Sequence, residues 1–469
     1  MTAQRFGLIA GALALLAASL LPPPAGLSRE GLVTAGLVVL MAAWWVTQAM
    51  PLTATAFMPF LVLPFAGVMS AQETASLYYS DILFLLLGGA FIALAIERTG
   101  LHRRLAVGIL RLVGPRAGPG TLLLAFMISA GLISTMISNT STALIMMPMA
   151  LAVLEGGGAD ADDPDGISGA LPLGIAFAAT IGGFGTIVGS PTNAIAVGLI
   201  EESLGYRIGF AEWMAYGMPL VVIGIPLAAL IVARVQRVHA TPFDSARARA
   251  AITTRAAWSA PERRLVPVVA ATFALWVAQA WIAPLLPAGS LTDGTIAIAA
   301  SMALFVVPDG TGRPLLTWAE ADRAPWGVIM MFGGGLALAA GMVQSGLAGW
   351  LGQELLPLRA APLLVVALTL VAMVIAITEF ASNVAAASAI MPVVVSLALG
   401  MGVDPLLLAV PAALAVSWGF MLPAGTGPNA IAWATGRIRI GSMVGAGLLL
   451  DVAGVVLIVT VVWGVRAVV

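Results

Sequence analysis

Long apolar stretches, separated by short polar or charged segments, run along this chain from end to end. They fall at about 7–22, 31–49, 53–68, 82–97, 119–154, 170–200, 212–234, 265–286, 291–307, 327–343, 361–400, 405–436 and 441–465. A helix needs about 20 predominantly apolar residues to cross a bilayer. The pattern therefore predicts an all-α polytopic membrane protein.

Four of these stretches are interrupted. Two of them, 119–154 and 361–400, are too long for one crossing, and each contains a polar cluster near its middle. The clusters are Ser138-Asn139-Thr140 and Ser382-Asn383. The other two, 170–200 and 405–436, are broken midway by Gly, Pro and Asn residues. We interpret the first two as re-entrant hairpins and the last two as broken helices, which leaves about 11 transmembrane helices.

Arginine placement predicts the sides of the membrane. Segments 98–116 and 234–264 carry five and seven arginines, and the positive-inside rule places both in the cytoplasm. A re-entrant hairpin at 119–154 keeps both segments inside. Two complete helices there would also do so, but the second would be short for a crossing. This topology puts the N-terminus in the cytoplasm and the C-terminus in the periplasm.

Three blocks of sequence recur in the same order in the two halves of the chain. The blocks are Leu87–Leu101 with Gly333–Leu347, Ser138-Asn139 with Ser382-Asn383, and Gly189–Ile195 with Gly425–Ile431. The predicted sides give the two copies opposite directions, and inverted repeats with broken helices are typical of secondary transporters. The predicted organisation is scaffold helices at 1–80, a first repeat at 81–234, a basic cytoplasmic linker at 235–264, scaffold helices and a connection at 265–325, and a second repeat at 326–469.

Composition narrows the function classes. Only 9% of the 469 residues are charged and 60% are hydrophobic, whereas soluble domains carry about 25% charged residues. The chain has no Lys, a net charge of −1, no Cys and two histidines, which argues against nucleic-acid binding, disulfides and Cys or His metal centres. An intramembrane enzyme would need a buried acid pair or a nucleophile with its base. The chain offers only an isolated Glu379, in an apolar limb of the predicted hairpin at 361–400. Glu379 is either a proton relay or a group that hydrogen-bonds to free backbone groups at the hairpin tip.

The helix breaks supply the candidate chemistry. Backbone groups freed at membrane depth survive only inside protein or beside a watery cavity. Freed carbonyls with hydroxyl and amide oxygens suit a hard cation such as sodium, and helix N-termini at the same breaks suit an anion. Because no Arg lies at the predicted midplane, an anionic substrate would need co-bound cations. The pattern thus predicts cation-coupled anion transport.

At these motifs the chain resembles the divalent anion–sodium symporters, which transport dicarboxylates, citrate or sulfate. The resemblance rests on the two Ser-Asn clusters, on Thr378–Asn383, and on the Pro-Asn breaks at 190–193 and 426–429, and it covers about residues 30–465. It implies a homodimer with a mobile transport domain that moves as an elevator. The chain departs from the family pattern at Val384, where a hydroxyl is expected, and at Thr192 and Gly427, where Pro is usual.

The resemblance also implies site residues. One sodium would bind at Ser134, Ser138, Asn139 and Gly189, and a second at Thr378, Ala381, Asn383 and Gly425. The substrate would contact Ser138, Asn139, Thr140, Ser190, Ser382, Asn383 and Thr426. Val384 removes one possible substrate contact.

The sequence therefore predicts sodium-coupled import of a small di- or multivalent anion across the bacterial inner membrane. C4-dicarboxylates such as succinate, malate or fumarate are the expected substrates, with sodium as the coupling ion and no other cofactor. The alternatives are a dicarboxylate exchanger of the same fold, or a sodium/citrate or sodium/sulfate symporter. A channel would lack concentrative uptake, and inverted repeats argue against it.

Overall fold

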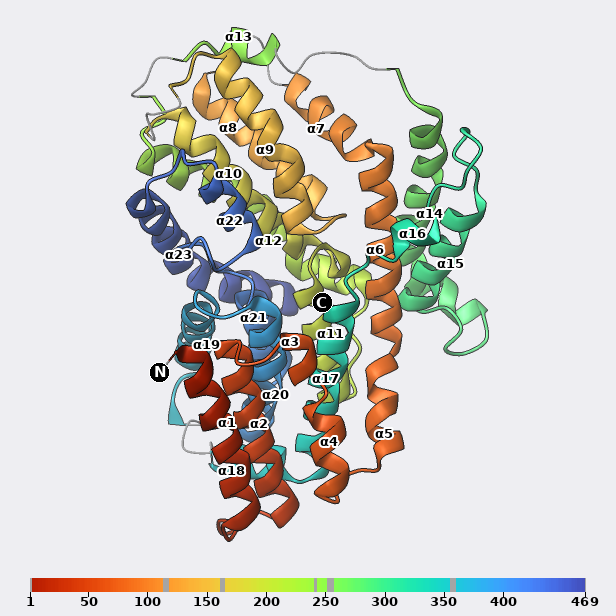
Figure 1. Cartoon of the computed structure of the whole chain (residues 1–469), viewed down its shortest axis with the longest axis vertical. Coiled ribbons are helices and arrows are strands. Elements are labelled where there is room, and N and C mark those ends of the chain that lie inside the picture. The colour runs from red at the N-terminus through yellow and green to blue at the C-terminus, as the bar shows by residue number, and fades with distance from the viewer. Residues whose placement is uncertain are drawn as a thin grey trace.

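Helices form nearly all regular structure in the computed structural model, which describes residues 2–112, 118–160, 165–239, 243–250, 257–354 and 360–468 (Figure 1). Within these residues, nine helices are long and apolar enough to cross a membrane. Eight of them, with the shorter apolar helices Leu52–Phe65, Asp293–Val306 and Leu406–Ala415, correspond to the expected crossings. The predicted fold class, an all-α polytopic membrane protein, is confirmed. Residues 240–242 and 251–256 of the predicted linker lie outside the described ranges.

The N-terminal helices begin with an antiparallel pair, α1 and α2, that packs along its length. Their lower ends lie together at the bottom of Figure 1. Gly100, at φ 78°, ends α6 in a left-handed cap that glycine adopts without strain, and α7 follows at once. The helices of this part are α1 (Ala3–Leu20), α2 (Arg29–Thr47), α3 (Leu52–Thr55), α4 (Met58–Phe65), α5 (Ala71–Ser76), α6 (Asp81–Thr99) and α7 (Leu101–Leu112).

Two helical hairpins are present where the polar clusters predict them. In the first, α8 (Pro119–Ser134) turns back into α9 (Asn139–Gly156), and in the second, α19 (Leu363–Thr378) turns back into α20 (Asn383–Met401). Each Ser of the Ser-Asn clusters takes the extended N-cap position of the returning helix, so the cluster itself ends one limb and begins the next. The two hairpins lie toward opposite ends of the molecule (Figure 1).

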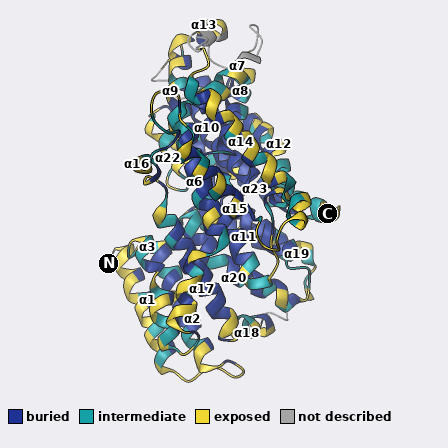
Figure 2. Ribbon diagram, turned by 90° about the vertical axis from the view of Figure 1, so that its right-hand side faces the viewer, coloured by how far each residue is buried: buried dark blue, intermediate teal, exposed yellow. Residues whose placement is uncertain are grey.

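Two broken helices pass beside these hairpins. In the first, α10 (Ile167–Gly182) leads through two short 3₁₀ turns to α11 (Pro191–Leu204). In the second, α21 (Leu406–Ala415) leads through an irregular segment to α22 (Gly427–Ala434). Every residue of α10 is buried, as expected of a helix that is apolar on all sides and surrounded by protein. Figure 2 shows this buried interior continuing between the exposed outer helices.

Close backbone contact fixes the first broken helix against the first hairpin. A Cβ added at Gly182 would collide with the backbone of Gly131 in α8. Small residues allow membrane helices to approach in this way. The end of α10 therefore lies directly beside the end of α8.

The remaining helices connect and enclose these elements. The second hairpin packs on α11, and the first packs on α10 and α22. A loop at 307–317 is held to the end of α6 by Arg98, which forms an ion pair with Asp309 and donates to the Pro314 carbonyl. The helices are α12 (Phe210–Val235), α13 (Ser245–Ala250), α14 (Ala260–Ile282), α15 (Asp293–Val306), α16 (Trp318–Ala321), α17 (Trp326–Gln344), α18 (Leu347–Glu354) and α23 (Ile440–Arg466).

Candidate ion and substrate site

The first polar cluster gathers oxygens from three parts of the chain. Ser134, the fully buried last residue of α8, donates from Oγ to Asn139 Oδ1 at 2.8 Å or to the Ala179 carbonyl at 2.6 Å. The Ala179 carbonyl, in the last turn of α10, also accepts the backbone N–H of Gly183. A Cβ on Gly189 would lie 2.7 Å from the Gly183 carbonyl, so the broken segment turns tightly against the cluster.

The orientation of the Asn139 amide decides what this cluster can hold. With the nitrogen turned inward, it donates to Ser134 Oγ at 2.8 Å and to the carbonyls of Ala179 and Gly189 at 3.2 Å each. With the oxygen turned inward, the amide oxygen, the Ser134 hydroxyl and the carbonyls of Ala179 and Gly189 bring four oxygens together. Amide orientation follows the hydrogen-bond environment. The first orientation closes the cluster on itself, and the second provides the oxygen ligands that a hard cation requires.

The second cluster repeats this arrangement. Thr378, the fully buried last residue of α19, donates from Oγ1 to Asn383 Oδ1 at 2.7 Å or to the Val416 carbonyl. Val416 is the C-cap of α21, and Ala179 lies in the last turn of α10. Both carbonyls therefore come from the C-terminal end of the first part of a broken helix. In both clusters, a buried hydroxyl lies between the Asn five residues later and a carbonyl from a broken helix.

Two further asparagines hold the broken segments in shape. Asn193 donates from Nδ2 to the carbonyls of Gly183 and Thr186 at 2.7 and 2.9 Å, and Asn429 donates to the Leu422 carbonyl at 3.1 Å. Both side chains are fully buried, and within the described residues neither Oδ1 has a hydrogen-bond partner. Both residues belong to the Pro-Asn motifs at 190–193 and 426–429, but the sequence pattern predicted no role for them.

Not every predicted ligand reaches the clusters through its side chain. The Ser138 hydroxyl is exposed and accepts the Ser141 N–H at 3.1 Å, so it caps α9. Ala381 continues the last turn of α19 by donating to the Ile377 carbonyl at 3.1 Å. Among the predicted substrate residues, Ser190, Ser382 and Thr426 are the N-caps of α11, α20 and α22. All three therefore stand at helix N-termini.

Thr140 connects the two halves of the chain. It is exposed on the first turn of α9, and a Cβ added at Gly427 would collide with its Oγ1. The glycine that replaces the usual Pro therefore leaves room for this hydroxyl at the start of α22. Val384, another departure, is half-buried and packs against apolar side chains of the core.

Glu379 is not isolated, which corrects the sequence-based interpretation. It is 1% exposed and accepts the backbone N–H groups of Met421 and Leu422 at 2.9 and 3.1 Å. Buried Asp451 on α23 lies close to this carboxyl group. Asp451 lies 72 residues further on, in the separate apolar stretch 441–465, so only the tertiary fold brings the two acids together.

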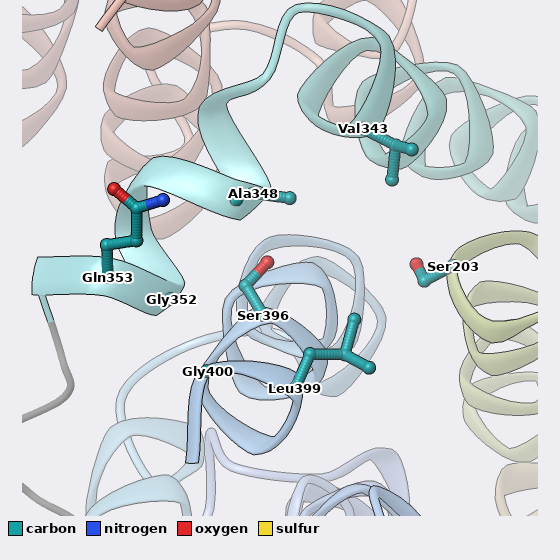
Figure 3. A pocket seen from close by; sticks show the side chains of 9 residues that line it. Ser203, Val343, Ala348, Gly352, Gln353, Ser396, Leu399 and Gly400 are labelled. Carbon is teal, nitrogen blue, oxygen red and sulfur yellow. The ribbon is translucent and has the colours of Figure 1, made fainter. Parts of the chain in front are cut away.

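A separate open pocket of about 400 Å³ lies away from both clusters. Figure 3 shows it between α18, the end of α17, the end of α20 and Ser203 of α11. The lining residues include Gln353, Ser396 and Leu399 but none of the predicted site residues. The candidate site is therefore the pair of clusters and the helix N-termini beside them, not this pocket.

Membrane-length helices, two hairpins and two broken helices with oxygen clusters at their ends define a polytopic membrane transport protein rather than an enzyme. The chain belongs to the family described as the sodium:sulfate symporter transmembrane region, whose profile matches residues 3–468. The resemblance to the divalent anion–sodium symporters is thereby confirmed.

Curated relatives match nearly the whole chain. The sodium-dependent dicarboxylate transporter SdcS of Staphylococcus saprophyticus is 36% identical over 98% of this chain and 91% of its own length. The protein of the same name from Staphylococcus aureus (strain USA300) is 34% identical over 99% and 92%. Among solved structures, the YdaH transporter of Alcanivorax borkumensis has a TM-score of 0.58 at 15% identity, covering 92% of this chain and 98% of that one. That likeness concerns the fold alone.

Proposed function

We propose that this protein is a sodium-coupled secondary transporter that imports C4-dicarboxylates such as succinate, malate or fumarate across the bacterial inner membrane. Its similarity along almost the full length to sodium-dependent dicarboxylate transporters supports the substrate class and the coupling ion. The observation that carries the proposal is the pair of matched oxygen clusters around Ser134 and Thr378.

Each cluster would hold one sodium ion. Ser134, Asn139 and Gly189 would supply ligands to the first, and Thr378, Asn383 and Gly425 to the second, with the carbonyls of Ala179 and Val416 as additional oxygens. Ser138 and Ala381 can contribute only through the backbone in the described conformation, because the Ser138 hydroxyl caps α9 and Ala381 has no polar side chain. Sodium would turn the Asn139 amide oxygen inward and so order the hairpin tip.

The dicarboxylate would bind at the adjacent helix N-termini. Unpaired N–H groups and the positive end of the helix dipole favour a carboxylate there. The proposed contacts are Ser138, Asn139, Thr140, Ser190, Ser382, Asn383 and Thr426. Two bound sodium ions would offset the charge of a dianion, which explains why no arginine is needed among these residues.

The movement that carries substrate across the membrane is proposed from the resemblance. The repeats at 81–234 and 326–469 would be inverted, with the N-terminus cytoplasmic and the C-terminus periplasmic. A transport domain built from the hairpins and broken helices would slide as an elevator against the scaffold of a homodimer.

Uptake of labelled succinate into proteoliposomes tests the proposal. Replacing external sodium by choline is expected to abolish concentrative uptake. Unchanged uptake in choline would contradict sodium coupling and favour an exchanger, which internal unlabelled succinate would then stimulate. Stronger competition by citrate or sulfate than by malate would contradict the proposed substrate class.

A further inference from the structure

The N-terminus of α10 is buried, and its first backbone N–H groups lack acceptors. Gly166, at φ 69°, is the N-cap and makes no side-chain hydrogen bond. The next three residues, Ile167, Ser168 and Gly169, are buried. The first hydrogen bond within the helix comes only from Ala170, which donates to the Gly166 carbonyl at 3.2 Å. In the described part of the chain, no acceptor hydrogen-bonds to the N–H groups of the three residues before it.

A buried arginine lies against this helix end. Arg437, in the segment between α22 and α23, is 8% exposed and donates from Nη1 to Ser168 Oγ at 3.0 Å. Ser168 in turn donates to the Asp160 carbonyl at 2.9 Å, so its hydroxyl hydrogen is already engaged. Among the described residues, no carboxylate forms an ion pair with Arg437, and its other guanidinium nitrogens have no hydrogen-bond partner.

The nearest acid along the chain is paired with a different arginine. Asp165, one residue before the N-cap of α10, lies 3.2 Å from Arg439 Nη1. The charge of Arg437 is therefore left uncompensated. A guanidinium buried beside the positive end of a helix dipole is unfavourable unless an anion lies between them.

A second buried group at this helix end also lacks a partner. The Gln236 carbonyl accepts the Gly166 N–H at 2.6 Å, which places the C-terminal end of α12 against the N-cap of α10. The Gln236 side chain is 0% exposed, and within the described residues neither Nε2 nor Oε1 is hydrogen-bonded. Buried amide groups normally have partners. This place therefore holds more hydrogen-bond donors than the protein itself satisfies.

This helix end is separate from the oxygen clusters. Ser168 and Ala179 are eleven residues apart on α10, which corresponds to about 16 Å along a helix. Figure 1 shows α22 beside α10, and the two helices pack on each other. Arg437 follows the C-terminal end of α22, whereas Thr426 is the N-cap of that helix. An anion bound at Arg437 would therefore not occupy the proposed substrate site.

We propose that the N-terminus of α10 and the Arg437 guanidinium form a binding site for one small oxyanion group, a carboxylate or a phosphate. The free N–H groups of residues 167–169 and the remaining N–H groups of Arg437 donate to it, and both kinds of donor suit such an anion. The bound anion connects α10 to the segment between α22 and α23. It thereby holds together two helices whose other ends lie at the candidate ion and substrate site.

Anion titrations of the purified wild-type protein in sodium-free choline buffer test this site. The proposed substrate site needs sodium to hold a dianion, so it does not contribute there. Inorganic phosphate and succinate are titrated separately at constant ionic strength. Equilibrium dialysis with the radiolabelled anion measures the half-saturating concentration, and thermal unfolding measures the stabilisation. We expect saturable binding of at least one anion, and the one that binds at the lower concentration identifies the preferred group.

Substitutions of Arg437 separate this site from adventitious binding. Arg437→Gln keeps a donor for Ser168 but removes the charge, so the half-saturating concentration should rise about tenfold or more. Arg437→Lys keeps the charge but loses the planar fork, and a rise of about threefold is expected. Arg323→Gln is the matched control, because Arg323 is an exposed arginine paired with Glu97 at 3.1 Å. It should leave the half-saturating concentration unchanged.

Two outcomes would overturn the inference. One is the absence of saturable binding of either anion to the wild type. The other is equal binding by the wild type and Arg437→Gln, since a general salt effect acts on both proteins alike. If Arg437→Gln does not fold, an unchanged half-saturating concentration in Arg437→Lys would overturn the inference instead. None of these measurements depends on sodium-coupled uptake, so failure of this site and failure of the proposed function are distinguishable.

Discussion

Ser134 and Thr378 make the same pair of contacts in different halves of the chain. Each is the last residue of a hairpin limb, and each places its hydroxyl between the Asn five residues later and a carbonyl of a broken helix. The two halves of the chain therefore contain oxygen clusters with the same arrangement.

Removing the cluster asparagines should stop transport without unfolding the protein. Asn139→Ala or Asn383→Ala deletes an amide oxygen that no neighbouring side chain can replace. Sodium-dependent succinate uptake is expected to fall by about two orders of magnitude, as the loss of roughly 3 kcal/mol from an ion-binding contact would produce. Ser301→Ala serves as the control for loss of a buried polar group. Full uptake in both Asn variants would refute the site assignment.

The cluster hydroxyls should tolerate exchange but not removal. Thr378→Ser and Ser134→Thr keep the oxygen and are expected to retain most uptake, whereas Thr378→Ala and Ser134→Ala should raise the sodium requirement about tenfold. The measurement is the sodium dependence of uptake at saturating succinate. An Ala variant that matches its conservative partner would show that the hydroxyl only ties its helix to a neighbour.

A methyl group at Gly183 should damage the first site by steric conflict. A Cβ there would overlap the Asn139 amide, so Gly183→Ala is expected to displace the amide and weaken sodium binding. Gly445→Ala is the matched control, because a Cβ at Gly445 meets nothing within 4 Å. Sodium-induced thermal stabilisation of the purified protein reports the effect without requiring transport. Equal stabilisation in the two variants would contradict the placement of Asn139.

The hydrophobic pattern and the helix breaks could be predicted from sequence because each depends on local composition. The polar clusters end and begin helices where Ser138 and Ser382 indicate, and the Pro-Asn motifs begin α11 and α22. The carbonyls of Ala179 and Val416 could not be predicted, since they become ligand candidates only through where α10 and α21 end. Asp451 was missed for a related reason: its partner is brought to it by helix packing, not by spacing along the chain.

The pairing of Arg98 with Asp309 should stabilise the fold over a defined pH range. Burial alone would raise the pKa of Asp309, but hydrogen bonds from Arg98 and Thr311 outweigh it and hold the pKa below its ordinary value. A lowered folded-state pKa gives stability that is fully present above the ordinary Asp pKa of about 3.9 and is lost as the pH falls through the lowered value. Asp309→Asn is therefore expected to lower the thermal unfolding temperature at pH 7.

The difference in unfolding temperature between the wild type and Asp309→Asn tests the contribution of this pair. It should stay constant from pH 8 to pH 5 and shrink only in stronger acid, where the wild-type carboxylate also becomes protonated. Asp322→Asn is the control, because Asp322 takes part in none of the ion pairs that hold this loop. It should leave the unfolding temperature unchanged over the same pH range. Unfolding followed by tryptophan fluorescence in detergent measures both variants. An Asp309→Asn protein that unfolds at the wild-type temperature at pH 7 would show that the loop at 307–317 is held by other contacts, such as the bond from Arg98 to the Pro314 carbonyl.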